Sequence, residues 1–152
     1  MKRRVVLMGL LALLAVWPGT SEAANPDFVV IVHKTNPVSK LSREELRPIF
    51  LANKTSWKTG KGIEALNLPE GTDTRQTFDT AVLGLDPEKV TQYWIDRKIR
   101  GDTKPPRKLP SSASVVRRVA TAQGAIGYAV STDIDASVKV VARIKGGKVV
   151  AP

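Results

Sequence analysis

Four stretches of the chain carry the apolar pattern of β-strands. The first is almost unbroken, which is typical of a strand covered on both faces. The last alternates apolar residues with Lys139, Val141 and Arg143, which predicts a strand with one face toward water. The four stretches are Phe28–His33, Ile63–Leu68, Ala125–Val130 and Val138–Ile144.

The end of the chain reads as a hairpin. Gly146 and Gly147 form a two-residue turn, because paired glycines readily adopt the positive φ angles of tight hairpin turns. We expect a return strand over Lys148–Val150.

Two helices are predicted in the first half of the chain. Ser42 lies three residues before Glu45, the spacing of a capping box, and Leu41 and Leu46 occupy the positions of a hydrophobic staple. Pro48 removes a backbone donor, so this helix should be short or bent. A second helix follows residues 72–74, ends near Gly84, and has an apolar face made of Phe78, Ala81, Val82 and Leu85.

Two more helices are predicted in the second half. Asp86 and Pro87 begin the third, whose buried stripe is Val90, Tyr93 and Trp94. Asp102–Pro110 contains three prolines and should be an irregular surface segment. Ser111 or Ser112 caps the fourth helix, which ends near Gly124 and buries Val115, Val116, Val119 and Ala120. The sequence therefore predicts the α/β class, with about four helices flanking a mixed sheet in one lobe.

The first 23 residues have the order of a secretory signal peptide. Three cations at positions 2–4 precede an apolar run from Val5 to Trp17, and small residues follow at Ser21 and Ala23. The run is shorter than the roughly 20 residues that span a membrane. We expect cleavage after Ala23, a domain over residues 24–152 and a periplasmic location.

The composition argues against most enzyme chemistry. The 152 residues contain no cysteine and one histidine, His33, so a thiol nucleophile and a zinc or iron–sulfur site are poor interpretations. Glu44 and Glu45 are accounted for by helix capping, which leaves Glu64 without a partner for acid–base catalysis. We expect neither an enzyme nor a bound metal or cofactor.

The chain is basic, with a formal net charge of +10 that becomes +8 once the first 23 residues are removed. Between residues 97 and 118 eight basic residues face one acid, Asp102. Such a patch attracts anions, although a charge run can also be only a solvated surface. The patch consists of Arg97, Lys98, Arg100, Lys104, Arg107, Lys108, Arg117 and Arg118.

The turn Thr72-Asp73-Thr74-Arg75 is the candidate binding site. A loop that runs into a helix presents free backbone N–H groups, and the helix dipole favours negative charge there. The hydroxyls of Thr72 and Thr74 add donors and Arg75 adds a planar cation. Asp73 works against this interpretation, because its carboxylate could cap the same amides and repel an anion.

Several motifs together resemble the phosphate-binding-protein-like family of periplasmic solute-binding proteins. They are Leu41-Ser42-Arg43-Glu44-Glu45-Leu46, Ile49-Phe50-Leu51, Trp57, the turn before Arg75 and Phe78, Tyr93-Trp94, Gly124-Ala125-Ile126-Gly127-Tyr128 and the tail from Gly146 to Pro152. The resemblance implies one lobe of the type II periplasmic binding fold, exported and without catalysis. It also implies that the Ser-Gly-Thr turn that holds phosphate in full-length relatives falls on Thr72-Asp73-Thr74, with Asp73 in place of glycine.

The resemblance covers one lobe only, since the phosphate loop of the other lobe has no counterpart in this sequence. A two-lobed binder buries its ligand between its lobes. We therefore expect weak binding of phosphate or a similar oxyanion through Thr72, Asp73, Thr74 and Arg75. The partners implied are an ABC-type importer or another envelope protein, and a homodimer could supply a second wall.

Two alternatives from other classes remain. One is a ligand-free envelope interaction module that uses the basic patch to contact an acidic protein or an anionic membrane surface. The other, nucleic-acid binding, is not expected, because export and the absence of an aromatic and basic stacking pattern argue against it.

Overall fold

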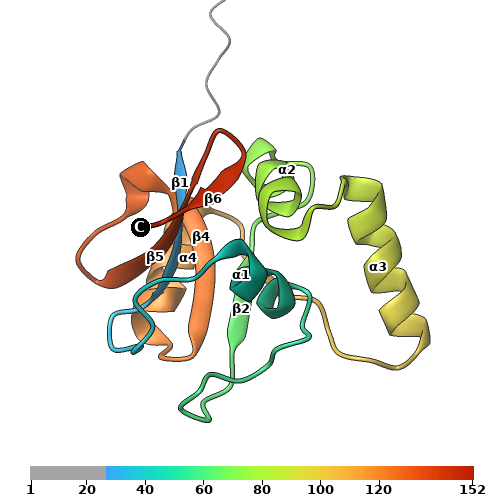
Figure 1. Cartoon of the computed structure of the whole chain (residues 1–152), viewed down its shortest axis with the longest axis horizontal. Helices are drawn as coiled ribbons and strands as arrows, with labels where there is room; N and C mark the ends of the chain where they lie inside the picture. Colours follow the sequence, from blue (N-terminus) through green and yellow to red (C-terminus); the bar gives the residue numbers. More distant parts are fainter. Residues whose placement is uncertain (1–26) are drawn as a thin grey trace, which may run out of the picture.

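The computed structural model describes residues 27–152, so the predicted signal peptide over residues 1–23 lies outside the described part. Six strands form one sheet in the order β3-β2-β4-β1-β5-β6 (Figure 1). Their bounds are β1 Phe28–His33, β2 Glu64–Asn67, β3 Arg107–Lys108, β4 Ala125–Val130, β5 Val138–Lys145 and β6 Lys148–Val150. This confirms the predicted mixed sheet.

Strand β1 is the centre of the sheet. It pairs antiparallel with both β4 and β5, and all six of its residues are buried, as its unbroken apolar run predicts. Strand β2 runs parallel to β4 and to β3. The segment Asp102–Pro110 is therefore not wholly irregular as expected, because Arg107 and Lys108 pair with Leu66 and Asn67 at the sheet edge.

The alternation predicted for Val138–Ile144 is interrupted by a β-bulge. Val30 pairs with Ala142 and Ile31 with Val140, so Val141 is the extra residue between them. Val141 was expected to face water but is fully buried, and its carbonyl accepts a hydrogen bond from the amide of Leu41 at 2.9 Å. The bulge thus joins β5 to the segment that begins the first helix.

The predicted hairpin is confirmed. Lys145 pairs with Lys148, and the intervening Gly146 and Gly147 have φ angles of 54° and 70°. Positive φ at both central positions is the backbone of the turn that matches the twist of paired strands.

The described helices lie near their predicted positions. They are α1 Arg43–Phe50, α2 Asp73–Phe78, the π-helix η1 Asp79–Leu83, α3 Pro87–Ile99, α4 Ser112–Thr121 and the 3₁₀-helix η2 Ser131–Asp133. Ser42 and Glu45 form the predicted capping box, and Asp86 and Ser111 cap α3 and α4. Helix α4 ends at Thr121, three residues before Gly124.

The second predicted helix is divided into an α-helical and a π-helical part. Its regular portion, α2, ends at Phe78, and η1 continues to the left-handed cap Gly84. Two arginines of α1 satisfy carbonyls near this end: Arg43 Nε donates to Ala81 O and Arg47 Nε donates to Leu83 O, both at 3.0 Å. Leu85 therefore lies beyond the helix that its spacing predicted.

Aromatic side chains pack between the sheet and the α1–α2 side of the molecule. The rings of Phe78 and Tyr128 stack with centroids 3.8 Å apart, and Phe50 contacts Phe78 edge-on at 4.6 Å. The Tyr128 hydroxyl donates to Asn67 Oδ1 and accepts from the amide of Leu68. Burial raises the pKa of Tyr128, so the phenol stays protonated and ties β4 to the end of β2.

Gly127 lies on the opposite face of β4, where α4 packs. A Cβ atom there would lie 2.5 Å from Cγ1 of Val115 and 3.2 Å from Cβ of Leu66. The absence of a side chain at residue 127 thus lets α4 approach the strand. Among residues 27–152, no helix is both long and apolar enough to cross a membrane.

We predict that Gly127→Ala destabilises the protein by about 1–3 kcal/mol, because overpacking forces α4 and the sheet apart. The free energy of unfolding, measured by urea denaturation, is the readout. Gly62→Ala is the matched control, since an added Cβ at residue 62 meets nothing within 4 Å. Equal stability of the two variants would contradict close packing at residue 127.

Candidate functional site

The turn that begins α2 is closed mainly by Thr72. Its Oγ1 accepts a hydrogen bond from the amide of Arg75 at 3.3 Å and donates to Pro69 O at 2.9 Å, while its carbonyl accepts from the amide of Gln76. Three of the donors expected to be free are therefore occupied, and Thr72 rather than Asp73 is the cap. Within residues 27–152, the amides of Asp73 and Thr74 have no protein acceptor.

Arg75 is directed inward and does not extend from the surface. It is 4% exposed, its Nε donates to Asp79 Oδ2 at 2.7 Å, and its Nη1 donates to Leu68 O at 3.0 Å. These bonds leave Nη2 without a hydrogen-bond partner in the described part of the chain. The planar cation predicted from the sequence is thus present, but it already forms an ion pair with the carboxylate of Asp79.

Asp79 completes the buried pair and is itself only half satisfied. Its Oδ2 accepts from Arg75, whereas Oδ1 is buried with no hydrogen-bond partner among residues 27–152. Burial raises the pKa of Asp79 above its ordinary value, and the opposing attraction of Arg75 is the smaller effect. Sequence analysis did not identify this residue, although its i,i+4 spacing from Arg75 was a usable signal.

The raised pKa of Asp79 predicts how stability depends on pH. A carboxyl group that binds its proton more tightly when folded stabilises the protein below its unfolded pKa, and this stability is lost as the pH rises. From about pH 3.5 to about pH 7, the difference in unfolding free energy between wild type and Asp79→Asn should therefore shift in favour of the variant. Urea denaturation at both pH values is the measurement. A shift toward the wild type would show that the charged pair is net stabilising.

A pocket of about 700 Å³ lies beside this pair, between α2, α3 and the segment 101–108. Its buried polar wall is formed by Asn67, Arg75 and Asp79. Its apolar wall includes Val90, Trp94, Ile95, Pro105 and Pro106, and Lys98, Lys104 and Lys108 are exposed residues of its lining. Of the predicted site, only Arg75 reaches the pocket wall; Thr72, Asp73 and Thr74 do not line it.

Helix α3 lies apart from the sheet, on the far side of α2 (Figure 1). Residues of both helices line the pocket. Of its predicted stripe, Val90 is buried, whereas Tyr93 and Trp94 are only half-buried. The helix is held at its C-terminal end by Arg97, which was expected in the exposed basic patch but is 6% exposed.

Arg97 joins α3 to two other segments. Its Nη1 donates to Leu51 O at 2.8 Å and to Asn53 Oδ1 at 2.7 Å, and its Nη2 donates to Thr103 Oγ1 at 2.8 Å. Its Nη2 also pairs with Asp102 at 3.2 Å. The hydrogen bond with the Tyr93 hydroxyl raises the pKa of Arg97 further. The residue therefore fixes the position of the pocket wall.

We predict that Arg97→Lys loosens α3 and the segment 101–108, because an ammonium cannot reproduce the fork of guanidinium bonds. Hydrogen exchange of the α3 amides should become faster while that of β1 is unchanged. Lys98→Arg is the control, since Lys98 is exposed on the same helix. Unchanged exchange in Arg97→Lys would show that α3 is held by its apolar contacts.

The remaining basic patch is partly neutralised. Glu64 pairs with Arg118 at 2.8 Å and with Arg107 at 3.5 Å, and Lys108 pairs with Glu70 at 3.4 Å. Lys98, Arg100, Lys104 and Arg117 are exposed and form no ion pair within residues 27–152. The basic patch predicted from the sequence is therefore divided, and Lys98, Lys104 and Lys108 line the pocket.

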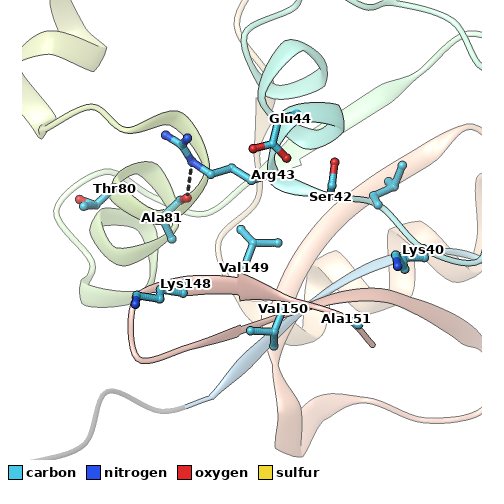
Figure 2. A pocket seen from close by; sticks show the side chains of 12 residues that line it. Lys40, Ser42, Arg43, Glu44, Thr80, Ala81, Lys148, Val149, Val150 and Ala151 are labelled. Carbon is cyan, nitrogen blue, oxygen red and sulfur yellow. Dashed lines mark hydrogen bonds between the residues drawn. The ribbon is translucent and has the colours of Figure 1, made fainter.

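A second pocket, of about 540 Å³, lies between the start of α1, the η1 segment and β6 (Figure 2). Arg43 crosses it to reach Ala81 O, and the side chain of Val149 extends from β6 toward Arg43 in the same view. Because Arg43 bonds this η1 carbonyl, its Nε is not available to a ligand of the second pocket. In the described part of the chain, no group of three or more His, Cys, Asp or Glu residues could hold a metal ion.

The family model described as a PBP superfamily domain matches residues 21–151. The chain belongs to this family. Solved structures with the same fold include an ABC-type phosphate transport receptor from Vibrio cholerae, with 20% identity and a TM-score of 0.61. A substrate-binding protein assigned to a phosphate ABC transporter of Clostridium perfringens, solved with bound phosphate, has 25% identity and a TM-score of 0.63. PstS from Borrelia burgdorferi has 12% identity and a TM-score of 0.60.

The chain matches only part of each of these solved structures. Each match covers 78% of this chain but only 46%, 45% and 47% of the respective solved chains. The chain thus spans less than half the length of the structures it resembles, in agreement with the single lobe expected from the sequence.

Proposed function

We propose that this protein is an exported, non-enzymatic solute-binding protein that binds a small oxyanion such as phosphate weakly in the α2–α3 pocket. The observation that carries the proposal is the position of Arg75. It lies in the pocket wall, its Nη2 has no hydrogen-bond partner among residues 27–152, and three lysines lie on the same lining. A guanidinium donor near three lysines suits an oxyanion, although the carboxylates of Glu70, Asp79 and Asp102 on the same lining reduce the attraction.

The turn Thr72–Thr74 has a supporting part in this proposal. Thr72 fixes the backbone that carries Arg75, through its bonds to the Arg75 amide and to Pro69. The amides of Asp73 and Thr74, which have no acceptor in the described part of the chain, add positive potential near the pocket, while the carboxylate of Asp73 reduces it. We therefore assign contact with the ligand to Arg75 and placement of Arg75 to the turn.

Weak binding follows from two features of the structure. The charge of Arg75 is offset by Asp79 at 2.7 Å, and the lysines of the lining are exposed to water. The chain also spans less than half of the related structures, so a second lobe that could enclose the ligand is not part of the described fold. A dissociation constant of about 1 mM, equivalent to about −4.1 kcal/mol, is the expected order.

Two similar structures are a receptor and a substrate-binding protein of phosphate ABC transporters, which favours an ABC-type importer as the partner class. The signal-like residues 1–23 support export to the periplasm. A second copy of the chain could cover the open side of the pocket and take the place of the other lobe. Sedimentation equilibrium with and without phosphate would test this, and an unchanged monomer would exclude the second copy.

We predict that Lys98→Ser combined with Lys104→Ser raises the dissociation constant for phosphate several-fold, because the two cations attract the anion to the pocket. Isothermal titration at low ionic strength is the measurement. Lys34→Ser combined with Lys58→Ser removes the same charge from exposed positions outside the pocket and should have little effect. No heat with the wild type at millimolar phosphate, or equal effects of the two double variants, would overturn the proposed function.

A further inference from the structure

We propose that the α2–α3 pocket selects an organic monoanion that has an apolar body and a hydrogen-bond donor next to its anionic group. An α-hydroxy acid with an apolar side chain represents this class. The inference rests on the anion position at Arg75 given under the proposed function and defines the ligand that would occupy it. Three features carry it: the polar wall, the apolar wall and the charge of the lining.

The polar wall offers a donor and an acceptor on adjacent groups. The single bond between Arg75 Nε and Asp79 Oδ2 leaves Arg75 Nη2 as a donor and Asp79 Oδ1 as an acceptor, neither with a partner in residues 27–152. An anionic oxygen satisfies Nη2 but is repelled by Oδ1. Oδ1 is buried and has no donor among the described residues, so we expect the ligand to satisfy it with an O–H or N–H group that enters the wall beside its anionic oxygen.

Asn67 adds a second donor to the same wall. Its Oδ1 accepts from the Tyr128 hydroxyl and from the amide of Leu68, at 3.2 Å for the latter. Its Nδ2 group forms no hydrogen bond within the described residues, and Asn67 is 6% exposed. A carboxylate with a hydroxyl on the adjacent carbon can therefore meet two donors and one acceptor.

The apolar wall favours a ligand with an apolar part over an inorganic ion. Val90 is buried, Ile95 is 46% exposed, and the Trp94 ring is fixed by edge contact with Tyr93 at 5.0 Å. The pocket volume of about 700 Å³ lies within the range that holds organic ligands, about 300–1,000 Å³. An inorganic oxyanion would leave this wall in water, whereas an apolar side chain would cover it.

The charge of the lining fits a monoanion. Four cations and three carboxylates line the pocket, a net charge of one positive: Arg75, Lys98, Lys104 and Lys108 against Glu70, Asp79 and Asp102. A zwitterionic amino acid would leave this charge unmatched, whereas a hydroxy acid would balance it.

Isothermal titration with three probes tests the class. Phenyllactate carries the carboxylate, the hydroxyl and the phenyl group, phenylpropionate lacks the hydroxyl, and lactate lacks the phenyl group. Phenyllactate should bind about tenfold or more tightly than either of the others, because each loses one of the two recognition elements. Equal affinity of phenyllactate and lactate, or of phenyllactate and phenylpropionate, would overturn the inference.

A matched pair of variants locates the binding. Ile95 lines the pocket, whereas Ile99, on the same helix and 79% exposed, does not. Ile95→Asp should reduce phenyllactate affinity about tenfold, to that of lactate, and Ile99→Asp should leave it unchanged. Circular dichroism confirms that both variants fold. Equal losses in the two variants would place binding elsewhere and reject the assignment.

Inorganic phosphate separates this inference from the proposed function. Phosphate binding without a preference for phenyllactate removes the organic ligand class and leaves oxyanion binding. A phenyllactate preference without phosphate binding rejects phosphate as a ligand and supports the organic class. If none of the four probes binds, both are wrong.

Discussion

The buried pair of Arg75 and Asp79 determines the arrangement of the candidate site. It connects α2 to η1 through a single Nε–Oδ2 bond, and Arg75 Nη1 extends the connection to Leu68 at the end of β2. Removing two charges from water is costly, and the raised pKa of Asp79 shows that burial outweighs the attraction here. The pair therefore defines the geometry of the pocket wall at a cost in desolvation.

The pocket also depends on a helix that stands away from the sheet. Helix α3 packs less of its surface than α1 or α4, and Arg97 anchors it to Leu51 and to the segment 101–108. Arg97 counts as part of the basic patch in the sequence, but in the structure it connects α3 to these two segments. The exposed charges around the pocket would provide the local attraction for the anion that we propose as ligand.

The aromatic core and the site meet at one strand end. Tyr128 stacks on Phe78, and its hydroxyl bonds Asn67, which also lines the pocket. The core of this PBP superfamily domain thus holds the polar wall directly. Arg75 and Phe78 both belong to α2, so this short helix contributes to the pocket wall and to the aromatic core.

Local rules were sufficient for most elements, since capping residues, apolar periodicity and paired glycines act over a few residues. Ser42 with Glu45, the unbroken run of β1 and Gly146-Gly147 all behave in the structure as their patterns indicate. Long-range packing decided the rest. The bulge buried Val141, pairing with Leu66 and Asn67 made a strand of Arg107 and Lys108, and Asp79 drew Arg75 inward. Composition can count charges, but which of them pair, and which line a pocket, depends on residues brought together only by folding.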